Sequence, residues 1–203
     1  MVSPRSRVRT GPKTQAERRA ETRAALLDGT IEALVTYGYG GATTGRIAEL
    51  AGVSRGAQTP YFPSRAELVG AAVQHLAEMR IQAFHERFAD KSISIAEGLD
   101  AVWEEHQGDV FDAALELWVA SRTDPELRKT MHRVEHDVAA AIVLEAKSAL
   151  GEVADRPGFN DDLIFALATI RGLALLRISN GVSSKALAER WNLTRDRLVR
   201  IFD

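Results

Sequence analysis

The sequence predicts an all-α protein with an N-terminal three-helix head and a C-terminal helical bundle that dimerises. Apolar residues recur at helical spacing along the whole 203-residue chain, and no segment shows the alternation of a half-buried strand. Capping boxes, in which a Ser or Thr precedes a Glu by three positions, begin at Thr14, Ser64 and Ser94. A turn at Gly52 separates two short segments. These observations predict helices joined by short connections.

Composition places the chain among soluble globular proteins. Hydrophobic residues make up 45% and charged residues 27% of the sequence, which are ordinary values for that class. No apolar run reaches the ~18 residues of a membrane span, and the Arg-rich start lacks the apolar core of a secretory signal. The absence of cysteine excludes disulfides and Cys-ligated zinc. We therefore expect a cytoplasmic protein that binds no membrane.

Charge is distributed unevenly along the chain. Residues 1–65 hold ten basic and five acidic residues, a net charge of +5, whereas residues 66–203 hold 16 basic and 23 acidic residues, a net charge of −7. A basic N-terminal third is what a polyanion-binding head needs. Chance clustering on a solvated surface is the alternative.

The first thirteen residues form a basic segment without an acid, and its cations are Arg5, Arg7, Arg9 and Lys13. We expect residues 1–13 to be a disordered arm that neutralises phosphates or enters the minor groove. A tail without function is the alternative.

A helix is expected from Thr14 to about Tyr37, because apolar residues recur there at helical spacing and Gly38 is suited to end a helix. A second helical segment, Thr44 to Leu50, meets the turn at Gly52, which tolerates a positive φ. Ser54 then opens a short third segment. Two helices joined by a short glycine turn form the layout of a DNA-binding helix-turn-helix.

This stretch resembles the N-terminal domain of the tetracycline-repressor (TetR) family of bacterial regulators. The matching positions are Gly38-Tyr39, Thr43, Ile47-Ala48, Ala51-Gly52-Val53-Ser54-Arg55-Gly56, Tyr61-Phe62, Ser64-Arg65 and Glu67-Leu68. The resemblance implies a helix-turn-helix domain over residues 14–63 and a ligand-binding and dimerisation domain over residues 64–203. It also implies a sequence-specific transcriptional regulator rather than an enzyme, most simply a repressor released by a small-molecule effector.

The resemblance implies that the third segment lies in the major groove of a near-palindromic, double-stranded operator. Arg55 suits guanine or phosphate, and Thr43 matches a family position that contacts phosphate. The expected DNA-binding residues are Thr43, Thr44, Arg46, Arg55, Gly56, Ala57, Thr59, Tyr61 and Arg65. The sequence departs from the family at Ala42, Arg46 and Thr59-Pro60. Because proline disfavours a helix interior, we expect the recognition helix to end or loosen near Gln58–Thr59. A continuous helix that absorbs the strain, held by Phe62 and the first helix, is the alternative.

The remaining segments predict a helical bundle. A long helix is expected from Ser64 to about Ala89, a second from Ser94 to Gln107, a third from there to Ser121, and a fourth from Asp124-Pro125 to Leu150. Residues 151–159 are predicted to be a loop. Two final segments are expected over residues 184–191 and 194–202.

The helix expected from Asn160 to Ser179 is apolar on nearly all sides. Such a helix must be covered all round, so we expect one face to pack on the subunit core and the other on a second copy. The sequence therefore predicts a homodimer through residues 160–191. A central helix of a monomeric bundle is the alternative.

Aromatic and polar residues of the C-terminal half are candidates for an effector pocket, and the alternative is plain core. They are Trp103, His106, Phe111, Leu115, Trp118, Met131 and Arg171. No cofactor or resident metal is expected.

A competing hypothesis rests on the sequence from His132 to His136, which matches the H-x-x-E-H pattern of a zinc peptidase family. It would make the protein a helical metallo-enzyme that uses His132 and His136. A DNA-binding protein without an effector is a third possibility.

Overall fold

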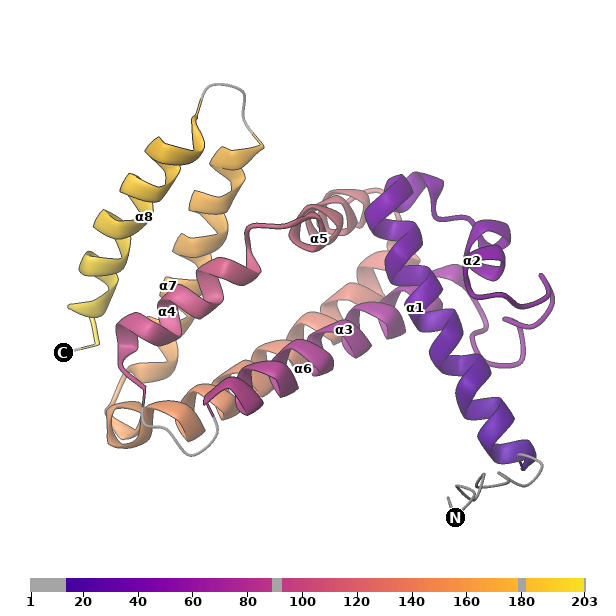
Figure 1. Cartoon of the computed structure of the whole chain (residues 1–203), viewed down its shortest axis with the longest axis horizontal. Coiled ribbons are helices and arrows are strands. Elements are labelled where there is room, and N and C mark those ends of the chain that lie inside the picture. The colour runs from indigo at the N-terminus through magenta and orange to yellow at the C-terminus, as the bar shows by residue number, and fades with distance from the viewer. Residues whose placement is uncertain (1–13, 89–92, 179–181, 203) are drawn as a thin grey trace, which may run out of the picture.

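The computed structural model describes residues 14–88, 93–178 and 182–202, and every regular element in these ranges is helical (Figure 1). The predicted all-α fold is therefore confirmed, while the arm predicted over residues 1–13 lies outside the described residues. The elements are α1 (Gln15–Gly41), α2 (Thr44–Leu50), α3 (Arg65–Phe88), α4 (Ile95–Glu105), α5 (Asp109–Ala120), α6 (Pro125–Leu150), η1 (Gly151–Asp155), α7 (Phe159–Ala174), η2 (Leu175–Arg177) and α8 (Ser184–Val199).

Local capping explains where several helices begin. The Thr14 and Ser94 side chains each accept a hydrogen bond from the backbone N–H three residues later. The glutamate at that position accepts one from the backbone N–H of Thr14 or Ser94, which completes both capping boxes. The third box is half formed. Ser64 Oγ accepts from the N–H of Glu67, but the Glu67 carboxylate instead accepts from Arg133 Nη2 at 3.0 Å. This ion pair joins α3 to α6.

Helix α1 bends at Gly38, where φ is 65° and ψ is 177°. The predicted helix stop is thus confirmed, because only glycine adopts this backbone region readily. A last turn of α1 follows the bend and ends at Gly41. The C-terminal region differs from the prediction, since α8 is one continuous helix where two segments were expected. No Gly or Pro interrupts the sequence at residues 192–193, so nothing there breaks the helix.

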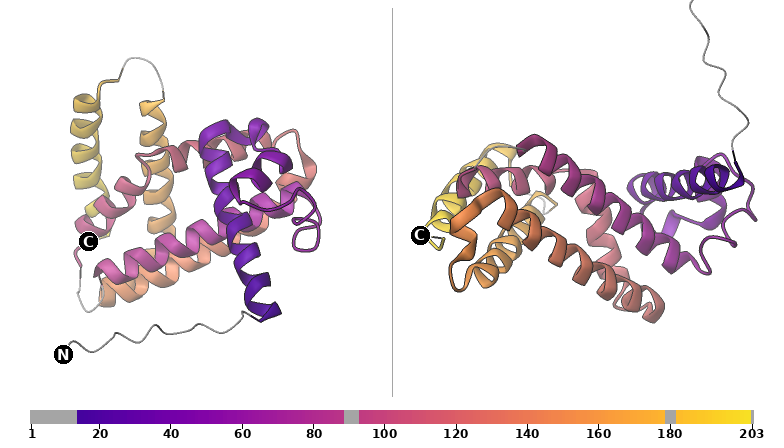
Figure 2. Two further views of the ribbon diagram at one scale, coloured as in Figure 1. Left: turned by 45° about the vertical axis from the view of Figure 1, so that its right-hand side comes forward. Right: turned by 90° about the horizontal axis from the view of Figure 1, so that it is seen from below.

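Helices α3 and α6 lie side by side and connect the two ends of the protein (Figures 1 and 2). They approach closely at Gly70, where an added Cβ would lie 2.2 Å from Thr130 Cγ2. Helices α1 and α2 pack at one end of this pair, and α4, α7 and α8 gather at the other. Helix α5 lies against both α1 and α6. No helix among the described residues combines the length and apolar character needed to cross a bilayer.

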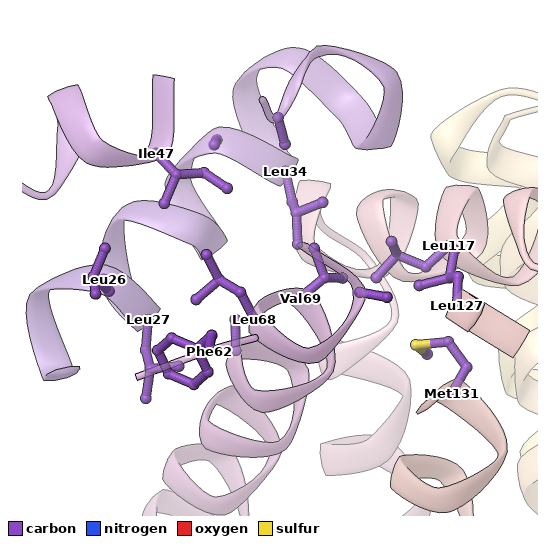
Figure 3. Close-up of a cluster of buried hydrophobic side chains, with 14 residues drawn as sticks. Leu26, Leu27, Leu34, Ile47, Phe62, Leu68, Val69, Leu117, Leu127 and Met131 are labelled. Atoms are coloured by element: carbon purple, nitrogen blue, oxygen red, sulfur yellow. The ribbon is translucent and has the colours of Figure 1, made fainter. Parts of the chain in front are cut away.

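The apolar core of the head continues into the body of the protein (Figure 3). Leu27, Ile47 and Phe62 from the head pack in one buried cluster with Leu117 of α5 and Met131 of α6. A second cluster at the other end centres on Trp103 and Trp191, whose rings stack with centroids 4.8 Å apart. Helices α5 and α6 therefore connect the head mechanically to the C-terminal bundle.

Candidate functional site

The first turn of α2 forms one part of the candidate nucleic-acid surface. Thr43 is its N-cap, and the Thr43 side chain accepts a hydrogen bond from the Arg46 N–H at 3.4 Å. Thr43 and Thr44 are both exposed. Backbone N–H groups and hydroxyls at a helix start are suited to phosphate, so this turn presents the chemistry that a DNA backbone requires.

The segment after the Gly52 turn does not form the short helix that the sequence predicted. It consists of two turns, one closed by the Ala57 N–H on Ser54 O at 2.9 Å and the other by the Tyr61 N–H on Gln58 O at 2.9 Å. The head thus contains two α-helices instead of three. Gly and Pro cost about 1 and 3 kcal/mol in a helix interior, and the segment carries both within a few residues, at Gly56 and Pro60.

Buried residues nevertheless fix this segment on the head. Phe62 and Gln58 are buried, and the half-buried Tyr61 packs against the same cluster. The Arg19 and Arg23 guanidinium carbons lie 5.5 Å from the ring centroids of Tyr61 and Phe62, respectively. The segment is anchored from beneath, so its outer side remains free to meet a ligand.

Arg55, Gly56 and Thr59 are exposed on that outer side, and Ala57 is half-buried. The Arg55 guanidinium lies beside the first turn of α2, because a Cβ added at Gly45 would be 3.7 Å from Arg55 Nε. The structure therefore places the Arg55 guanidinium beside Gly45, in the first turn of α2.

The other two predicted arginines have partners within the head. Arg46 donates from Nη1 to Gly41 O at 3.0 Å and lies 4.6 Å from the Tyr37 ring centroid. Arg65 donates from Nε to Ala42 O at 3.0 Å and from Nη2 to Tyr39 O. Both side chains satisfy carbonyls around the end of α1. Arg46 is exposed, whereas Arg65 is half-buried, so Arg46 is the better placed for a phosphate.

Three exposed arginines on α1 were missed by reasoning from motifs. Arg18, Arg19 and Arg23 lie on the first turns of α1. Two of them, Arg19 and Arg23, contact the rings of Tyr61 and Phe62 in the segment after the Gly52 turn. They extend the cationic surface of the head. Their signal in the sequence was a basic cluster within six residues at a helix start, where basic residues oppose the helix dipole.

A cavity of about 270 Å³ lies among α3, α4, α5, α6 and α7. Three of the predicted ligand residues line it, namely His106, Phe111 and Arg171. Trp103 instead stacks on Trp191 in the core, and Met131 belongs to the cluster beneath the head.

Two further predicted residues, Leu115 and Trp118, are on α5 but do not line the cavity. Trp118 donates from Nε1 to Glu135 Oε1 at 2.7 Å. Arg80 and Glu145, which do line the cavity, were not predicted. They come from α3 and α6, and only the crossing of these two helices brings them together.

The electrostatics of the cavity are set by burial. His106 donates from Nδ1 to Val102 O at 2.7 Å. Burial lowers the pKa of His106, and the nearby Arg171 and Arg80 guanidinium groups lower it further. Burial also lowers the pKa of Arg80, which forms an ion pair with Glu105. At neutral pH the imidazole is therefore uncharged and the arginines supply the positive charge.

The structure does not assemble a metal site at the H-x-x-E-H pattern. His132 and His136 are exposed on α6, while the Glu135 carboxylate is taken by Trp118. Among the described residues, no group of three or more His, Asp or Glu side chains is placed to hold a metal. The metallo-enzyme hypothesis gains no support from this geometry.

A helical head with exposed arginines, joined to a helical body, is typical of a class of DNA-binding proteins. A family model described as "Bacterial regulatory proteins, tetR family" matches residues 26–72. The HTH-type transcriptional regulator CymR of Pseudomonas putida is 32% identical over 167 residues, which cover 80% of this chain and 82% of that protein. This chain belongs to the TetR family, and it is a DNA-binding transcriptional regulator.

Solved structures share the fold. A TetR-family transcriptional regulator from Rhodococcus sp. has a TM-score of 0.65 at 20% identity, with 88% of this chain and 99% of that chain covered. The multidrug binding protein EbrR complexed with ethidium has a TM-score of 0.61 at 20% identity, with 89% and 98% covered.

Proposed function

We propose that the protein is a cytoplasmic, homodimeric repressor that a small-molecule effector releases from a near-palindromic operator. The cavity among α3, α4, α5, α6 and α7 carries this proposal, because its walls continue into helices that pack on the head. The complex of EbrR with ethidium supports the view that this fold holds small molecules.

Helix α5 provides the connection between cavity and head. Phe111 near its start lines the cavity. Glu116, one and a half turns further on, accepts a hydrogen bond from the Tyr39 N–H at the end of α1, at 2.8 Å. Tyr39 in turn donates from its hydroxyl to Asp124 at 2.9 Å, just before α6. A ligand that displaces α5 therefore acts directly on the bend that positions the head.

An exposed apolar face on α7 supports the proposed dimer. Ile164 is 58% and Phe165 is 57% exposed, and Ala168, Gly172 and Leu175 continue the same face of the helix. Large apolar side chains gathered on one face mark interaction surfaces. In a two-fold dimer this face packs on its own copy, with the small residues allowing close approach.

The decisive test is selection of bound duplexes from random DNA. We expect a near-palindrome whose half-site centres lie about one helical turn, ~34–36 Å, or a multiple of it apart. Selection that enriches no sequence would contradict the proposal. If the selected DNA is bound but no small molecule releases it, the protein is a DNA-binding protein without an effector.

Replacing Arg55 by Ala is expected to weaken operator binding by roughly 1–3 kcal/mol, the usual loss for a base-reading arginine. The exposed position of Arg55 beside α2 is the physical reason. Fluorescence anisotropy at fixed salt measures the affinity. Arg200→Ala, at the C-cap of α8 and the far end of the subunit from the head, is the matched control and should bind like the wild type. Unchanged affinity for Arg55→Ala would exclude Arg55 from readout.

Replacing Pro60 by Ala is expected to stabilise the head and to tighten operator binding. Proline is about 3 kcal/mol less favourable than alanine in a helix interior, so the variant removes the main obstacle to a regular recognition helix. The helix content measured by far-ultraviolet circular dichroism, the melting temperature and the operator affinity should all increase.

Pro63→Ala is the control for Pro60, because Pro63 is exposed and lies outside the two turns. It should change the helix content little. If Pro60→Ala bound more weakly and melted lower than the wild type, the two-turn conformation itself would be the DNA-binding form.

A further inference from the structure

We propose that the effector is a small apolar molecule with one carboxylate group, and that the Arg171 guanidinium binds this carboxylate. The inference rests on the proposed function, because it concerns the ligand of the proposed effector cavity. It specifies the charge and the chemical class of that ligand.

The cavity wall is apolar apart from five ionisable side chains. Aliphatic and aromatic residues or glycine supply the other positions, among them Phe84, Ile142 and Leu167. The volume of about 270 Å³ is just below the ~300–1,000 Å³ usual for ligand pockets. An apolar body of modest size therefore fits the wall, and the ionisable residues decide which polar group it carries.

Four of the five ionisable side chains have at least one hydrogen-bond or ion-pair partner that fixes their charge. Arg80 forms an ion pair with Glu105, and both side chains line the cavity. Glu145 lies 3.1 Å from His85 Nδ1. His106 is held by the Val102 carbonyl and is neutral at pH 7, because burial lowers its pKa.

Arg171 on α7 is the exception. Within the described parts of the chain its side chain makes no hydrogen bond, and its ion-pair partner, Glu135 Oε2, is 3.8 Å from Nη1. The other oxygen of Glu135 accepts from Trp118 Nε1 at 2.7 Å. The Arg171 guanidinium carbon lies 5.0 Å from the Trp118 ring centroid. The Trp118 ring thus orients the Arg171 guanidinium, while its N–H donors make no hydrogen bond.

The unsatisfied groups of the cavity are donors. Among the described lining residues, the fully buried side-chain nitrogen and oxygen atoms without a hydrogen-bond partner are Arg80 Nε and Arg171 Nε. No carboxylate oxygen of Glu105 or Glu145 is in this state. Buried donors without partners are costly, so a bound molecule is stabilised when it brings acceptor oxygens to them.

Because these donors are cationic, an anionic acceptor gains most. Guanidinium and carboxylate match as planar, two-pronged partners and form charge-assisted hydrogen bonds. A single carboxylate suits Arg171, because its own ion pair with Glu135 is long, at 3.8 Å, and leaves its donors without a hydrogen bond. A cationic ligand would instead place its charge beside Arg171 and would have to displace Arg80 or His85 from a glutamate.

The test measures binding to the purified full-length protein by calorimetry. The probes are hexanoate, octanoate, decanoate and 4-phenylbutyrate, each with its amide and amine counterparts. At least one carboxylate is expected to bind below about 1 mM and roughly tenfold more tightly than its amide and amine. Failure of every carboxylate, or equal or tighter binding of an amide or amine, would overturn the inference.

Variants localise the charge. Arg171→Gln should weaken carboxylate binding roughly tenfold and leave amide binding unchanged, while Arg171→Lys should retain part of the affinity. Arg190→Gln, exposed on α8 and outside the cavity, is the control. Melting curves establish that each variant is folded. Carboxylate binding that Arg171→Gln does not weaken would overturn the assignment of Arg171.

Operator release separates this inference from the proposed function. If a carboxylate binds through Arg171 but never releases the protein from operator DNA, the cavity binds carboxylates as inferred, and the proposal that its ligand is the effector is wrong. If an amine or amide releases the protein from DNA, the proposal of a small-molecule effector stands, and the inference that this effector is a carboxylate is wrong.

Discussion

Ala168→Glu is expected to give a folded monomer that no longer binds its operator tightly. Ala168 is exposed on the apolar face of α7, so a glutamate there is tolerated by the isolated subunit. In a two-fold dimer the same change places two carboxylates in a desolvated contact, at a cost of several kcal/mol per buried ion. Sedimentation velocity gives the mass, and circular dichroism shows that the helices persist.

Two companion variants sharpen this experiment. Ala174 is 0% exposed in the C-terminal core, so Ala174→Glu should unfold that core instead of separating subunits. Ala140→Glu introduces the same charge at an exposed site on α6 and should remain a dimer. A dimeric Ala168→Glu protein would show that α7 is not the interface.

Gly38→Ala is expected to cause a large loss of stability at the junction between head and body. The φ of 65° and ψ of 177° at Gly38 cost a non-glycine residue on the order of 1–3 kcal/mol. An added Cβ would also lie 2.3 Å from Glu116 Oε2, the atom that accepts the Tyr39 N–H. Loss of a hydrogen bond to a charged group adds roughly 1.5–3 kcal/mol.

Urea unfolding measures the effect, and Gly40→Ala is the matched control. Gly40 is exposed, and nothing lies within 4 Å of a Cβ added there. The double variant Gly38→Ala/Glu116→Ala should be less destabilised than the sum of its two single variants, because the clash is removed. Equal losses from Gly38→Ala and Gly40→Ala would contradict this account of the bend.

Local signals predicted the parts of the fold that local chemistry controls. Thr14 and Ser94 were recognisable as helix caps, Gly38 as a helix stop and Gly52 as a turn, because each effect acts within a few residues. The short helix predicted after Ser54 was wrong, because the structure has no regular helix at residues 54–60. Gly56 and Pro60 act together there in a segment too short to recover the cost of nucleating a helix.

The site was harder to predict because it depends on contacts between distant segments. Arg65 matched the family pattern, but its partners Tyr39 and Ala42 are more than twenty residues away in the sequence. Helical periodicity shows which residues share a face and not which helix that face meets. Arg80 on α3 and Arg171 on α7 could therefore be recognised as neighbours of one cavity only from the packed structure.

The shared core beneath the head also bears on how such regulators can diversify. Leu117, Leu127 and Met131 complete the packing of α1, α2 and the start of α3 (Figure 3). A head transplanted from a relative would have to match these three side chains, so exchange of whole heads is disfavoured. Substitution at Arg55 or Thr59 leaves the core untouched, because both are exposed. New operator preferences are therefore expected to arise by point changes in this outer segment, with the ligand response inherited intact.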